Sequence, residues 1–446
     1  MKAFVVSGTH SGCGKTTVSL ALMAALVRRG YRVAPFKVGP DFIDPGHHRQ
    51  VCGHPSYNLD QWMIPLEENR RFLQGAALWA QVAVVEGVMG LFDGASARED
   101  TGSTAALAKA LGLPVVLVVD ARRQARSIAA LIRGFEAFDP RLQLAGVILN
   151  QVGSKRHESL LSEAIETYCQ IKLLGTLPRR EDLSLPSRHL GLVDAGSFHL
   201  GTELLDRLAC WVEEGVDLDR LLSLAKDISP GSFFSPSSDS GPLVAYAFDE
   251  AFSFYYQANL EALSRAGARL RPFSPLREEL PSETRAVYLG GGYPELFADA
   301  LTENKKILHD LRQAAASGIP IYAECGGFMF LCRGLRQKGR LIPWAGIFPF
   351  EVEMGQRYRA LGYREVLFLK DNFLGPAGCR ARGHEFHYSH LLGHYQGPRI
   401  YRLFDARGRE LGTEGFLREK ALGSYVHLHF ASNPLLASSL VAAAQG

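Results

Sequence analysis

The sequence lacks the features that mark several classes of protein. Its 446 residues include seven cysteines, an odd number with no CxxC pair and no repeated spacing, so neither a disulfide framework nor a structural zinc site is indicated. No apolar run reaches the roughly 18 residues that a membrane-spanning helix needs. The chain opens directly into an apolar run and a glycine loop, which leaves no room for a signal peptide. We therefore expect a cytoplasmic protein that does not enter a membrane.

An excess of charge of one sign is also missing. The 49 lysines and arginines are nearly balanced by 46 aspartates and glutamates, which gives a net charge of +3. Proteins that bind nucleic acids usually carry a clear basic surplus. The sequence therefore predicts no nucleic-acid partner.

What the first half does contain is a regular alternation of short apolar runs and amphipathic segments. Near-continuous apolar strands separated by helices predict a parallel sheet covered on both faces, the α/β doubly wound class. Ligands of such sheets bind at the carboxyl ends of the strands. The expected strands are 3–7, 32–37, 81–86, 114–120 and 144–150, and the expected helices include 16–29 and 102–111.

A change of composition divides the chain. Residues 226–242 are rich in Ser, Pro and Gly, which disfavours a regular element. A second alternating set follows, with expected strands at 243–248, 286–289 and 319–323, a helix at 252–266, and a strand-rich pattern after Trp344. We expect an N-terminal α/β domain (1–225), a linker (226–242) and a C-terminal α/β domain (243–446).

The first strand leads into the segment Gly-Thr-His-Ser-Gly-Cys-Gly-Lys-Thr-Thr, residues 8–17. Glycines allow backbone N–H groups to approach phosphates, a lysine reaches the terminal phosphates, and a threonine hydroxyl ligates magnesium. Five residues separate Gly8 from Gly14, so the loop is a variant of the usual pattern. A glycine turn that binds nothing is the bland alternative, and the coincidence of these residues with a strand-to-helix junction disfavours it. The predicted ATP ligands are Gly12, Gly14, Lys15, Thr16 and Thr17.

Carboxylates follow the next two expected strands. Asp41 and Asp44 come after the second strand, and Glu86 and Asp93 come with the third. Phosphoryl transfer needs carboxylates to hold Mg²⁺ and to orient the acceptor. We predict Thr16, Asp41 and Glu86 as magnesium ligands and place Asp44 and Asp93 nearer the acceptor substrate. For Asp41 and Asp44, ordinary turn capping is the alternative.

Asn150 ends the strand 144–150. Its side-chain amide can both donate and accept hydrogen bonds, so it is a candidate for the adenine edge. A simple turn residue is the alternative.

The second half holds a candidate nucleophile in Tyr-Ala-Glu-Cys-Gly-Gly, where Cys325 lies between an apolar strand and an apolar helix. Such a turn exposes the thiol, the helix N-terminus is expected to lower its pKa, and the N–H of Gly326 can stabilise an oxyanion. A second glycine loop, residues 289–295, offers Gly291 as another oxyanion donor. His427 is the best candidate base. The alternative, a cysteine that is merely buried, suits Cys332 and Cys210 better.

Three histidines, His384, His387 and His390, lie close together in the sequence. On a strand their spacing alternates between faces, and the segment has no HExxH pattern. We expect a strand that lines a polar site and no metal centre.

Six motifs together resemble the cobyrinate a,c-diamide synthase family over essentially the whole chain. They are Ser-Gly-Thr-His-Ser-Gly-Cys-Gly-Lys-Thr-Thr, Lys-Val-Gly-Pro-Asp-Phe-Ile-Asp-Pro, Glu-Gly-Val-Met-Gly-Leu-Phe-Asp-Gly, Gly-Gly-Gly-Tyr-Pro-Glu, Glu-Cys-Gly-Gly-Phe-Met and Gly-His-Glu-Phe-His-Tyr-Ser. The resemblance implies a dethiobiotin-synthetase-like, ATP- and corrinoid-binding phosphate-loop domain (1–225) joined to a class I glutamine amidotransferase, or glutaminase, domain (243–446). It implies amidation of the a and c acetates of a corrin ring, with cobyrinate, glutamine and ATP as substrates.

The resemblance also implies roles for the residues. Cys325 attacks the glutamine amide, His427 carries the proton, and Lys15, Thr16, Glu86 and Asp41 position Mg-ATP. Many class I glutaminases have a carboxylate two residues after the catalytic histidine, whereas this chain has His429 there. A Cys–His dyad is therefore expected, and the identity of any orienting group stays open.

Other interpretations remain at this point. The acceptor could be hydrogenobyrinate or nickel sirohydrochlorin, which carry similar acetates. Cobyric acid synthase shares both domains but does not carry Gly-Pro-Asp-Phe-Ile-Asp-Pro in this form. From a different class, a partitioning or metal-insertion ATPase with a regulatory domain would not need a reactive Cys325. A homodimer is compatible with the sequence.

Overall fold

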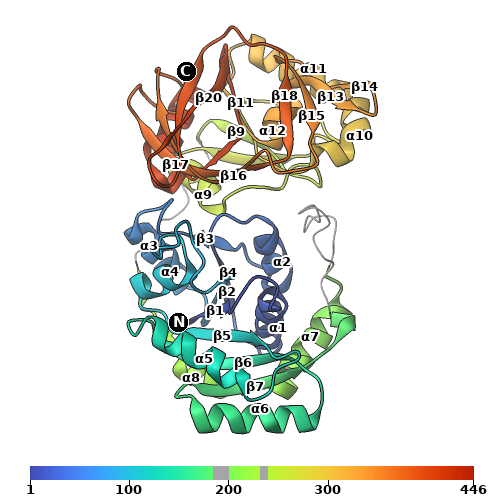
Figure 1. The fold of residues 1–446 in the computed structure, drawn as a ribbon. Coiled ribbons are helices and arrows are strands. Elements are labelled where there is room, and N and C mark those ends of the chain that lie inside the picture. Colours follow the sequence, from blue (N-terminus) through green and yellow to red (C-terminus); the bar gives the residue numbers. More distant parts are fainter. Residues whose placement is uncertain (184–199, 232–239) are drawn as a thin grey trace. The chain divides into compact units, whose positions relative to one another are not determined.

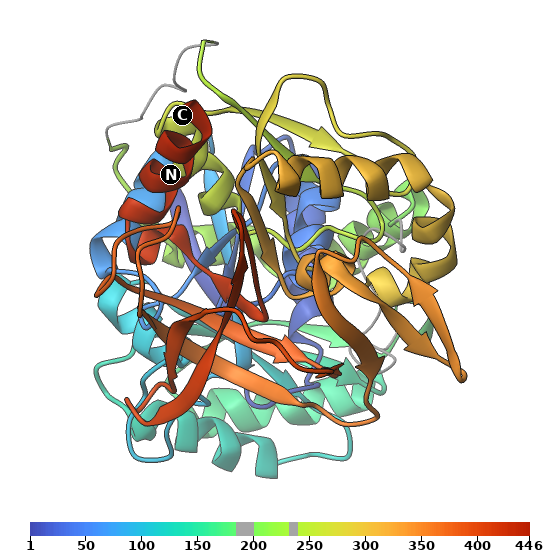
Figure 2. The same cartoon turned by 90° about the horizontal axis from the view of Figure 1, so that it is seen from above.

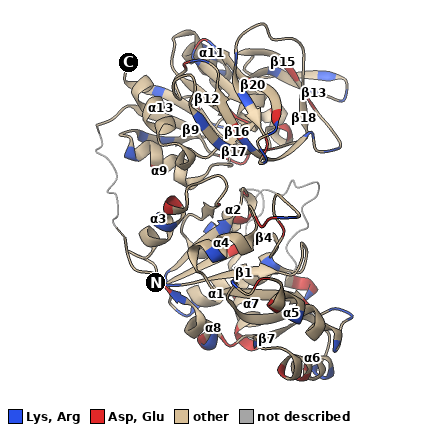
Figure 3. Cartoon of the chain, turned by 60° about the vertical axis from the view of Figure 1, so that its left-hand side comes forward, with Lys and Arg blue, Asp and Glu red and all other residues tan. Residues whose placement is uncertain are grey.

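The computed structural model describes residues 1–183, 200–231 and 240–446, and the chain forms two compact units, 1–233 and 234–446 (Figure 1). Each unit has its own sheet and its own hydrophobic core. Lys and Arg are interspersed with Asp and Glu along both units (Figure 3). Among the described residues, no helix is both long enough and apolar enough to cross a bilayer.

Unit 1 is built on an eight-stranded sheet of order β3-β2-β4-β1-β5-β6-β7, with β8 beside β1. Apart from the antiparallel β8, the strands are parallel, and helices lie on both faces (Figure 1). The described strands are β1 (Lys2–Gly8), β2 (Val33–Val38), β3 (Tyr57–Leu59), β4 (Val82–Gly90), β5 (Val115–Asp120), β6 (Leu144–Val152), β7 (Lys172–Pro178) and β8 (Lys226–Asp227). The described helices are α1 (Lys15–Arg28), α2 (Ile43–Cys52), α3 (Leu66–Ala76), α4 (Thr104–Leu111), α5 (Ser127–Phe138), α6 (Lys155–Tyr168), α7 (Thr202–Gly215) and α8 (Leu218–Leu224).

The core of unit 1 lies between the sheet and the helices α1, α7 and α8. The helix α1 is apolar nearly all round and its residues from Val18 to Leu26 are buried, as expected of a helix covered by both a sheet and other helices. This packing fixes the start of α1 directly behind the loop that follows β1. The fold class and the five strands expected in this half are confirmed, whereas β3, β7 and β8 were not predicted.

The expected linker begins inside the first sheet. Lys226 and Asp227 form β8, which pairs antiparallel with β1. The backbone N–H of Ile228 donates to the carbonyl of Met1, and the N–H of Gly231 donates to the carbonyl of Gln74. The expectation that no regular element occurs from residue 226 is wrong, because the first residues of β1, which β5 does not pair, supply hydrogen-bond partners that composition does not reveal. Residues 232–239 of the expected linker lie outside the described residues.

Unit 2 contains a ten-stranded sheet of order β10-β9-β11-β12-β21-β20-β19-β16-β17-β22 and a four-stranded sheet of order β14-β13-β15-β18. The first five strands of the large sheet are parallel, and the remainder are antiparallel. The large sheet comprises β9 (Leu243–Ala247), β10 (Arg269–Phe273), β11 (Thr284–Leu289), β12 (Ile321–Glu324), β16 (Ala360–Phe368), β17 (Arg380–His387), β19 (Arg399–Phe404), β20 (Glu410–Arg418), β21 (Ala421–Ser424) and β22 (Val426–Leu428). The small sheet comprises β13 (Cys332–Gln337), β14 (Arg340–Pro343), β15 (Phe348–Met354) and β18 (Ser389–Leu392).

The described helices of unit 2 cover its large sheet, and the C-terminal helix packs beside α9 (Figure 2). They are α9 (Gln257–Arg265), α10 (Ala298–Glu303), α11 (Lys305–Ala316), α12 (Gly326–Leu331) and α13 (Leu435–Gln445). The helix expected at 252–266 therefore starts five residues late. Phe254 is held outside it because its backbone pairs with Gly291, a contact that local sequence does not encode.

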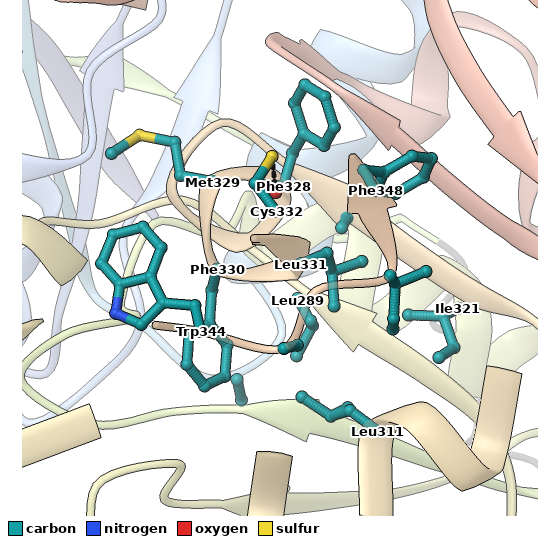
Figure 4. Close-up of a cluster of buried hydrophobic side chains, with 14 of the residues drawn as sticks. Leu289, Leu311, Ile321, Phe328, Met329, Phe330, Leu331, Cys332, Trp344 and Phe348 are labelled. Atoms are coloured by element: carbon teal, nitrogen blue, oxygen red, sulfur yellow. Dashed lines mark hydrogen bonds between the residues drawn. The ribbon is translucent and has the colours of Figure 1, made fainter. Parts of the chain in front are cut away.

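The helix α12 is buried completely. Its side chains pack with Leu289, Ile321 and Trp344 in one apolar cluster (Figure 4). Cys332 belongs to this cluster and its Sγ lies 3.4 Å from the carbonyl oxygen of Phe328, as expected of a structural cysteine. The cluster holds the turn at Cys325 in place.

Candidate active sites

The phosphate loop of unit 1 connects β1 to α1 as predicted. Gly12 and Gly14 have φ angles of 89° and 90°, a backbone conformation that favours glycine. A Cβ on Gly14 would lie 2.1 Å from Nδ2 of Asn150, so the loop also needs a residue without a side chain there. Lys15 and Thr16 begin α1, which directs them toward the adjacent end of β4.

Asn150 supports the phosphate loop. Its Nδ2 donates to the carbonyl of Cys13 at 3.0 Å and its Oδ1 accepts from the N–H of Gln151 at 2.8 Å. The side chain is buried. Both ends of the amide are thus engaged within the protein, and the predicted contact with adenine stays a prediction.

Glu86 is the centre of a buried charge cluster and lies in the middle of β4, which continues to Gly90, beyond the strand end predicted at residue 86. One carboxylate oxygen, Oε1, accepts from Thr16 at 2.7 Å, from Lys37 at 3.0 Å and from Lys15 at 3.2 Å. The other, Oε2, lies 2.8 Å from Nε2 of His48. Burial alone would raise the pKa of Glu86, but Lys37, Lys15 and His48 hold it well below the usual range. The cluster therefore keeps an ionised carboxylate beside the phosphate loop.

The two lysines of the cluster differ. Burial and the neighbouring Lys37 lower the pKa of Lys15, although Glu86 opposes this. Burial also disfavours the charge on Lys37, but Asp44, at 2.6 Å, and Glu86 raise its pKa. The positive charge of Lys15 is therefore less fully balanced by neighbouring carboxylates than that of Lys37. An incoming phosphate would supply the missing negative charge.

The predicted aspartates take separate places. The Oδ1 of Asp41 caps the start of α2 by accepting from the N–H groups of Ile43 and Asp44, which is the turn chemistry considered as its alternative. Asp44 is buried and ion-paired with Lys37. The exposed Asp93 accepts from the N–H of Gly90 at 2.9 Å. The structure thus brings Asp44 into the Glu86 cluster, while the contacts of Asp93 close a turn.

Lys37 and His48 were not predicted as site residues from the sequence. A signal existed for Lys37, which is a charged residue one position before the end of a fully buried strand. His48 follows Asp44 by four residues in α2, so the two share a helix face. Neither signal shows that the side chains meet Glu86, because that depends on the packing of β2, β4 and α2.

Thr16 and Glu86 fit a magnesium ion by chemistry. Both present oxygen atoms, which Mg²⁺ prefers, and the two oxygens are 2.7 Å apart beside the phosphate loop. Within the described residues, no three His, Cys, Asp or Glu side chains form a metal cluster. The predicted ligand Asp41 is engaged in capping through one oxygen.

In unit 2, Cys325 lies on the turn between β12 and α12. Its φ of 46° and ψ of −106° are unusual for a residue with a side chain, and such strain is common where a turn must present a reactive group. The N–H of Cys325 donates to the carbonyl of Ser424 at 2.7 Å. A Cβ on Gly327 would lie 2.3 Å from the carbonyl oxygen of Leu289. The second glycine of the motif is therefore required by the neighbouring loop.

The loop 290–292 lies against both the cysteine turn and the histidine. A Cβ on Gly326 would be 2.9 Å from the carbonyl oxygen of Gly292, and one on Gly291 would be 2.4 Å from Cε1 of His427. The N–H of Gly291, however, donates to the carbonyl of Phe254 at 3.3 Å. The predicted second oxyanion donor is thus already engaged, whereas the N–H of Gly326 faces the thiol and favours its charged form.

The expectation of a lowered thiol pKa is wrong for the free protein. Burial raises the pKa of Cys325, and the negative charges of Glu295 and Glu385 add to the effect. The hydrogen bond from the N–H of Gly326 lowers the pKa, but by less than burial and the two carboxylates raise it. Burial by α12 and the neighbouring strands raises the thiol pKa more than the N-terminus of this short helix lowers it. The resting nucleophile is therefore the neutral thiol.

His427 lies on β22 and is buried. Its ring stacks on His384 of β17 with centroids 4.8 Å apart, and its Nδ1 is 3.7 Å from Oε2 of Glu324. His384 also lies 2.6 Å from the hydroxyl of Tyr256. As expected, β17 lines a polar site. The two histidines of β17 contact different residues: His384 contacts His427 and Tyr256, whereas His387 binds Glu385.

His429 does not supply the missing carboxylate function. It is fully buried, its Nδ1 accepts from the N–H of Ala431, and burial lowers its pKa to about 3. The ring is therefore neutral and caps the short turn that follows β22.

ATP-dependent glutamine amidotransferases need one site that handles phosphate and another that removes ammonia from glutamine, and the two units supply one of each. Comparison with known families agrees. The CobQ/CobB/MinD/ParA nucleotide binding domain matches residues 4–193, and the CobB/CobQ-like glutamine amidotransferase domain matches residues 243–435.

Curated relatives resemble the chain over nearly its full length. A cobyrinate a,c-diamide synthase of Syntrophotalea carbinolica is 46% identical over 98% of this chain and 97% of its own. One from Salmonella typhimurium is 42% identical over 99% and 98%. The chain belongs to the cobyrinate a,c-diamide synthase family. Among solved structures, a glutamine amidotransferase covers 46% of this chain and all of its own at 15% identity, with a TM-score of 0.33 that supports no argument.

Proposed function

We propose that this chain catalyses the ATP- and glutamine-dependent amidation of the a and c acetate carboxylates of cobyrinate, a step of cobalamin biosynthesis. The observation that carries the proposal is the identity of 42–46% to synthases of that name, which spans both units. The phosphate-binding end of unit 1 and the cysteine turn of unit 2 account for the two half-reactions. We further propose a cytoplasmic location and no nucleic-acid partner, which the free cysteines and balanced charge favour.

In unit 2, the Cys325 thiol would give its proton to His427 and attack the side-chain carbonyl carbon of glutamine. The N–H of Gly326 would stabilise the oxyanion, His427 would protonate the departing nitrogen, and ammonia would leave. Water would then hydrolyse the thioester to glutamate and free the thiol.

In unit 1, the backbone of residues 12–17 would hold the phosphates of ATP, with Lys15 and Lys37 beside the γ-phosphate. A substrate carboxylate would attack that phosphorus, giving an acyl phosphate and ADP. Ammonia would then attack the acyl carbon and displace phosphate. Magnesium, held by Thr16 and Glu86, would neutralise phosphate charge. We propose that Asp44 positions Lys37 through their ion pair. Asp93 remains a candidate for binding the acceptor substrate.

The test uses purified protein with Mg-ATP, glutamine and cobyrinate, and mass spectrometry to count acid-to-amide conversions. We expect two conversions in the wild type. Cys325→Ala should lose them with glutamine and regain them with ammonia, whereas Cys332→Ala, which changes a structural cysteine, should keep the use of glutamine. Hydrolysis of glutamine without amidation of cobyrinate would overturn the assigned acceptor, and hydrogenobyrinate and nickel sirohydrochlorin would then be assayed.

A further inference from the structure

Glu324 is a buried carboxylate that precedes the proposed nucleophile in the chain and lies 3.7 Å from the ring of the proposed base. It ends β12, directly before Cys325, and is only 1% exposed. Burying an ionisable group is costly unless other groups compensate. The protein compensates with hydrogen bonds from three separate strands, which holds the carboxylate in one orientation.

The hydrogen bonds define where each oxygen of Glu324 points. Its Oε1 accepts from the hydroxyl of Tyr322 at 2.6 Å and from the N–H of Leu428 at 3.0 Å. Its Oε2 accepts from the hydroxyl of Tyr288 at 2.9 Å and lies 3.7 Å from Nδ1 of His427. One oxygen is thus used for anchoring, and the other is held toward the imidazole.

A carboxylate beside Nδ1 of a histidine has a defined effect on acid–base chemistry. It favours the tautomer with the proton on Nδ1, which leaves Nε2 free to accept a proton, and it stabilises the imidazolium that then forms. The distance of 3.7 Å is longer than a hydrogen bond, but catalytic contacts commonly tighten when substrate binds.

We propose that Glu324 is the positioning residue of the glutaminase site, so that Cys325, His427 and Glu324 form a triad in place of a dyad. The third member of the triad is thus the residue directly before the nucleophile. It would orient the histidine, as the carboxylate two residues after the histidine does in many class I glutaminases. His429, which occupies that second position, is neutral and bonded elsewhere. The inference rests on the proposed glutaminase activity of unit 2.

Other ionisable groups also face this pair. His384 stacks on His427 from β17, Cys325 lies on the adjoining turn, and Tyr288 and Tyr322 bind the carboxylate. The Glu324 carboxylate lies within ion-pair distance of His427, at 3.7 Å. Removing its charge should therefore change the titration of the base more than removing a tyrosine hydroxyl does.

The test compares Glu324→Gln with the wild type in the full chain, by glutamate release as a function of glutamine concentration and pH. We expect kcat to fall by about a hundredfold, as general-base contributions predict, with KM changed less than about threefold. We also expect the acidic limb of the kcat/KM profile to move to lower pH, because the imidazolium has lost its counter-ion. Amidation supplied with ammonia should persist, which shows that the variant is folded.

Two control variants separate positioning from a structural role. Tyr322→Phe removes one anchoring hydrogen bond but keeps the charge, so the acidic limb should stay in place. Glu414→Gln changes a carboxyl that accepts from Ser424 and Tyr425, and it should leave kcat near the wild-type value.

The outcomes are distinguishable. A wild-type kcat and an unmoved acidic limb in Glu324→Gln would overturn the triad and leave the glutaminase assignment intact. No glutamate release by the wild type would overturn the proposed function itself. If Glu324→Gln does not fold, Glu324→Asp retracts the charge by one methylene, and an unchanged kcat in that variant would refute the positioning role.

Discussion

Lys37 and Glu86 form a buried ion pair in which Nζ lies 3.0 Å from Oε1 and neither side chain is more than 2% exposed. The two residues are register partners on two neighbouring parallel strands, β2 and β4. Such a pair is retained at a cost in desolvation, so its position beside the phosphate loop argues for a function in phosphate chemistry.

Replacing Lys37 tests that function. Lys37→Met should lower amidation at least about a hundredfold with either glutamine or ammonia, because a cation at the transferring phosphoryl group is lost. It should also destabilise unit 1 by about 3 kcal/mol, since it leaves Asp44 and Glu86 buried with one partner fewer. Product analysis and thermal denaturation measure the two effects. Lys155→Met, on a lysine whose side chain is 96% exposed, should change neither, and normal amidation by Lys37→Met would refute the role.

The hydroxyl of Thr16 provides a test of magnesium binding. Thr16→Ala should raise the Mg²⁺ concentration for half-maximal ATP cleavage at least about tenfold, because it removes an oxygen ligand. Thr16→Ser keeps that oxygen and should behave as the wild type does. Equal magnesium dependence in all three proteins would remove Thr16 from the metal site.

The state of the nucleophile can be read from its alkylation. Because burial raises the pKa of Cys325, its reaction with iodoacetamide in the free protein should quicken about tenfold per pH unit from pH 7 to 9. Mass spectrometry of the peptide that contains residue 325 gives the rate. A rate already at its plateau at pH 7 would show that the thiolate exists before glutamine binds.

Glu414 provides a prediction about the pH dependence of stability. Burial raises its pKa from 4.5 to about 8. Between these two pH values, the folded protein keeps a proton on this side chain that the unfolded chain has released. Its favourable contribution is complete below pH 4.5 and is lost as the pH rises to about 8.

Glu414→Gln should therefore flatten the loss of stability with pH. The melting temperature of the wild type should fall relative to that of the variant between pH 5 and pH 8.5, as followed by thermal denaturation at each pH. Melting curves that stay parallel over this range would show that Glu414 titrates normally.

Local sequence was sufficient for features that depend on neighbouring residues. The phosphate loop and the turn at Cys325 each lie within about ten residues, and their glycines, lysine and cysteine fix both the backbone and the chemistry. The strands of the doubly wound sheet were recognisable for the same reason, because each is a continuous apolar run between helices.

What sequence could not show depends on contacts between distant residues. Lys37, His48 and Glu86 meet because β2, β4 and α2 pack together, and no local pattern reports that meeting. The thiol pKa was predicted in the wrong direction because the short helix was visible in the sequence, whereas the burial of Cys325 was not. Glu324 was given no role from the sequence, although its carboxylate lies 3.7 Å from the ring of a histidine about a hundred residues away.

The pairing of β8 with β1 also bears on where the chain could be divided. The backbone of Met1 exchanges two hydrogen bonds with that of Ile228, so two segments of unit 1 that are distant in the chain lie side by side. A domain whose ends meet can be fused to another coding sequence, or separated from it, without cutting its sheet. Because the backbone of Gly231 still bonds to Gln74, a division of the chain into two polypeptides would keep the contacts of unit 1 whole only if it fell after residue 231.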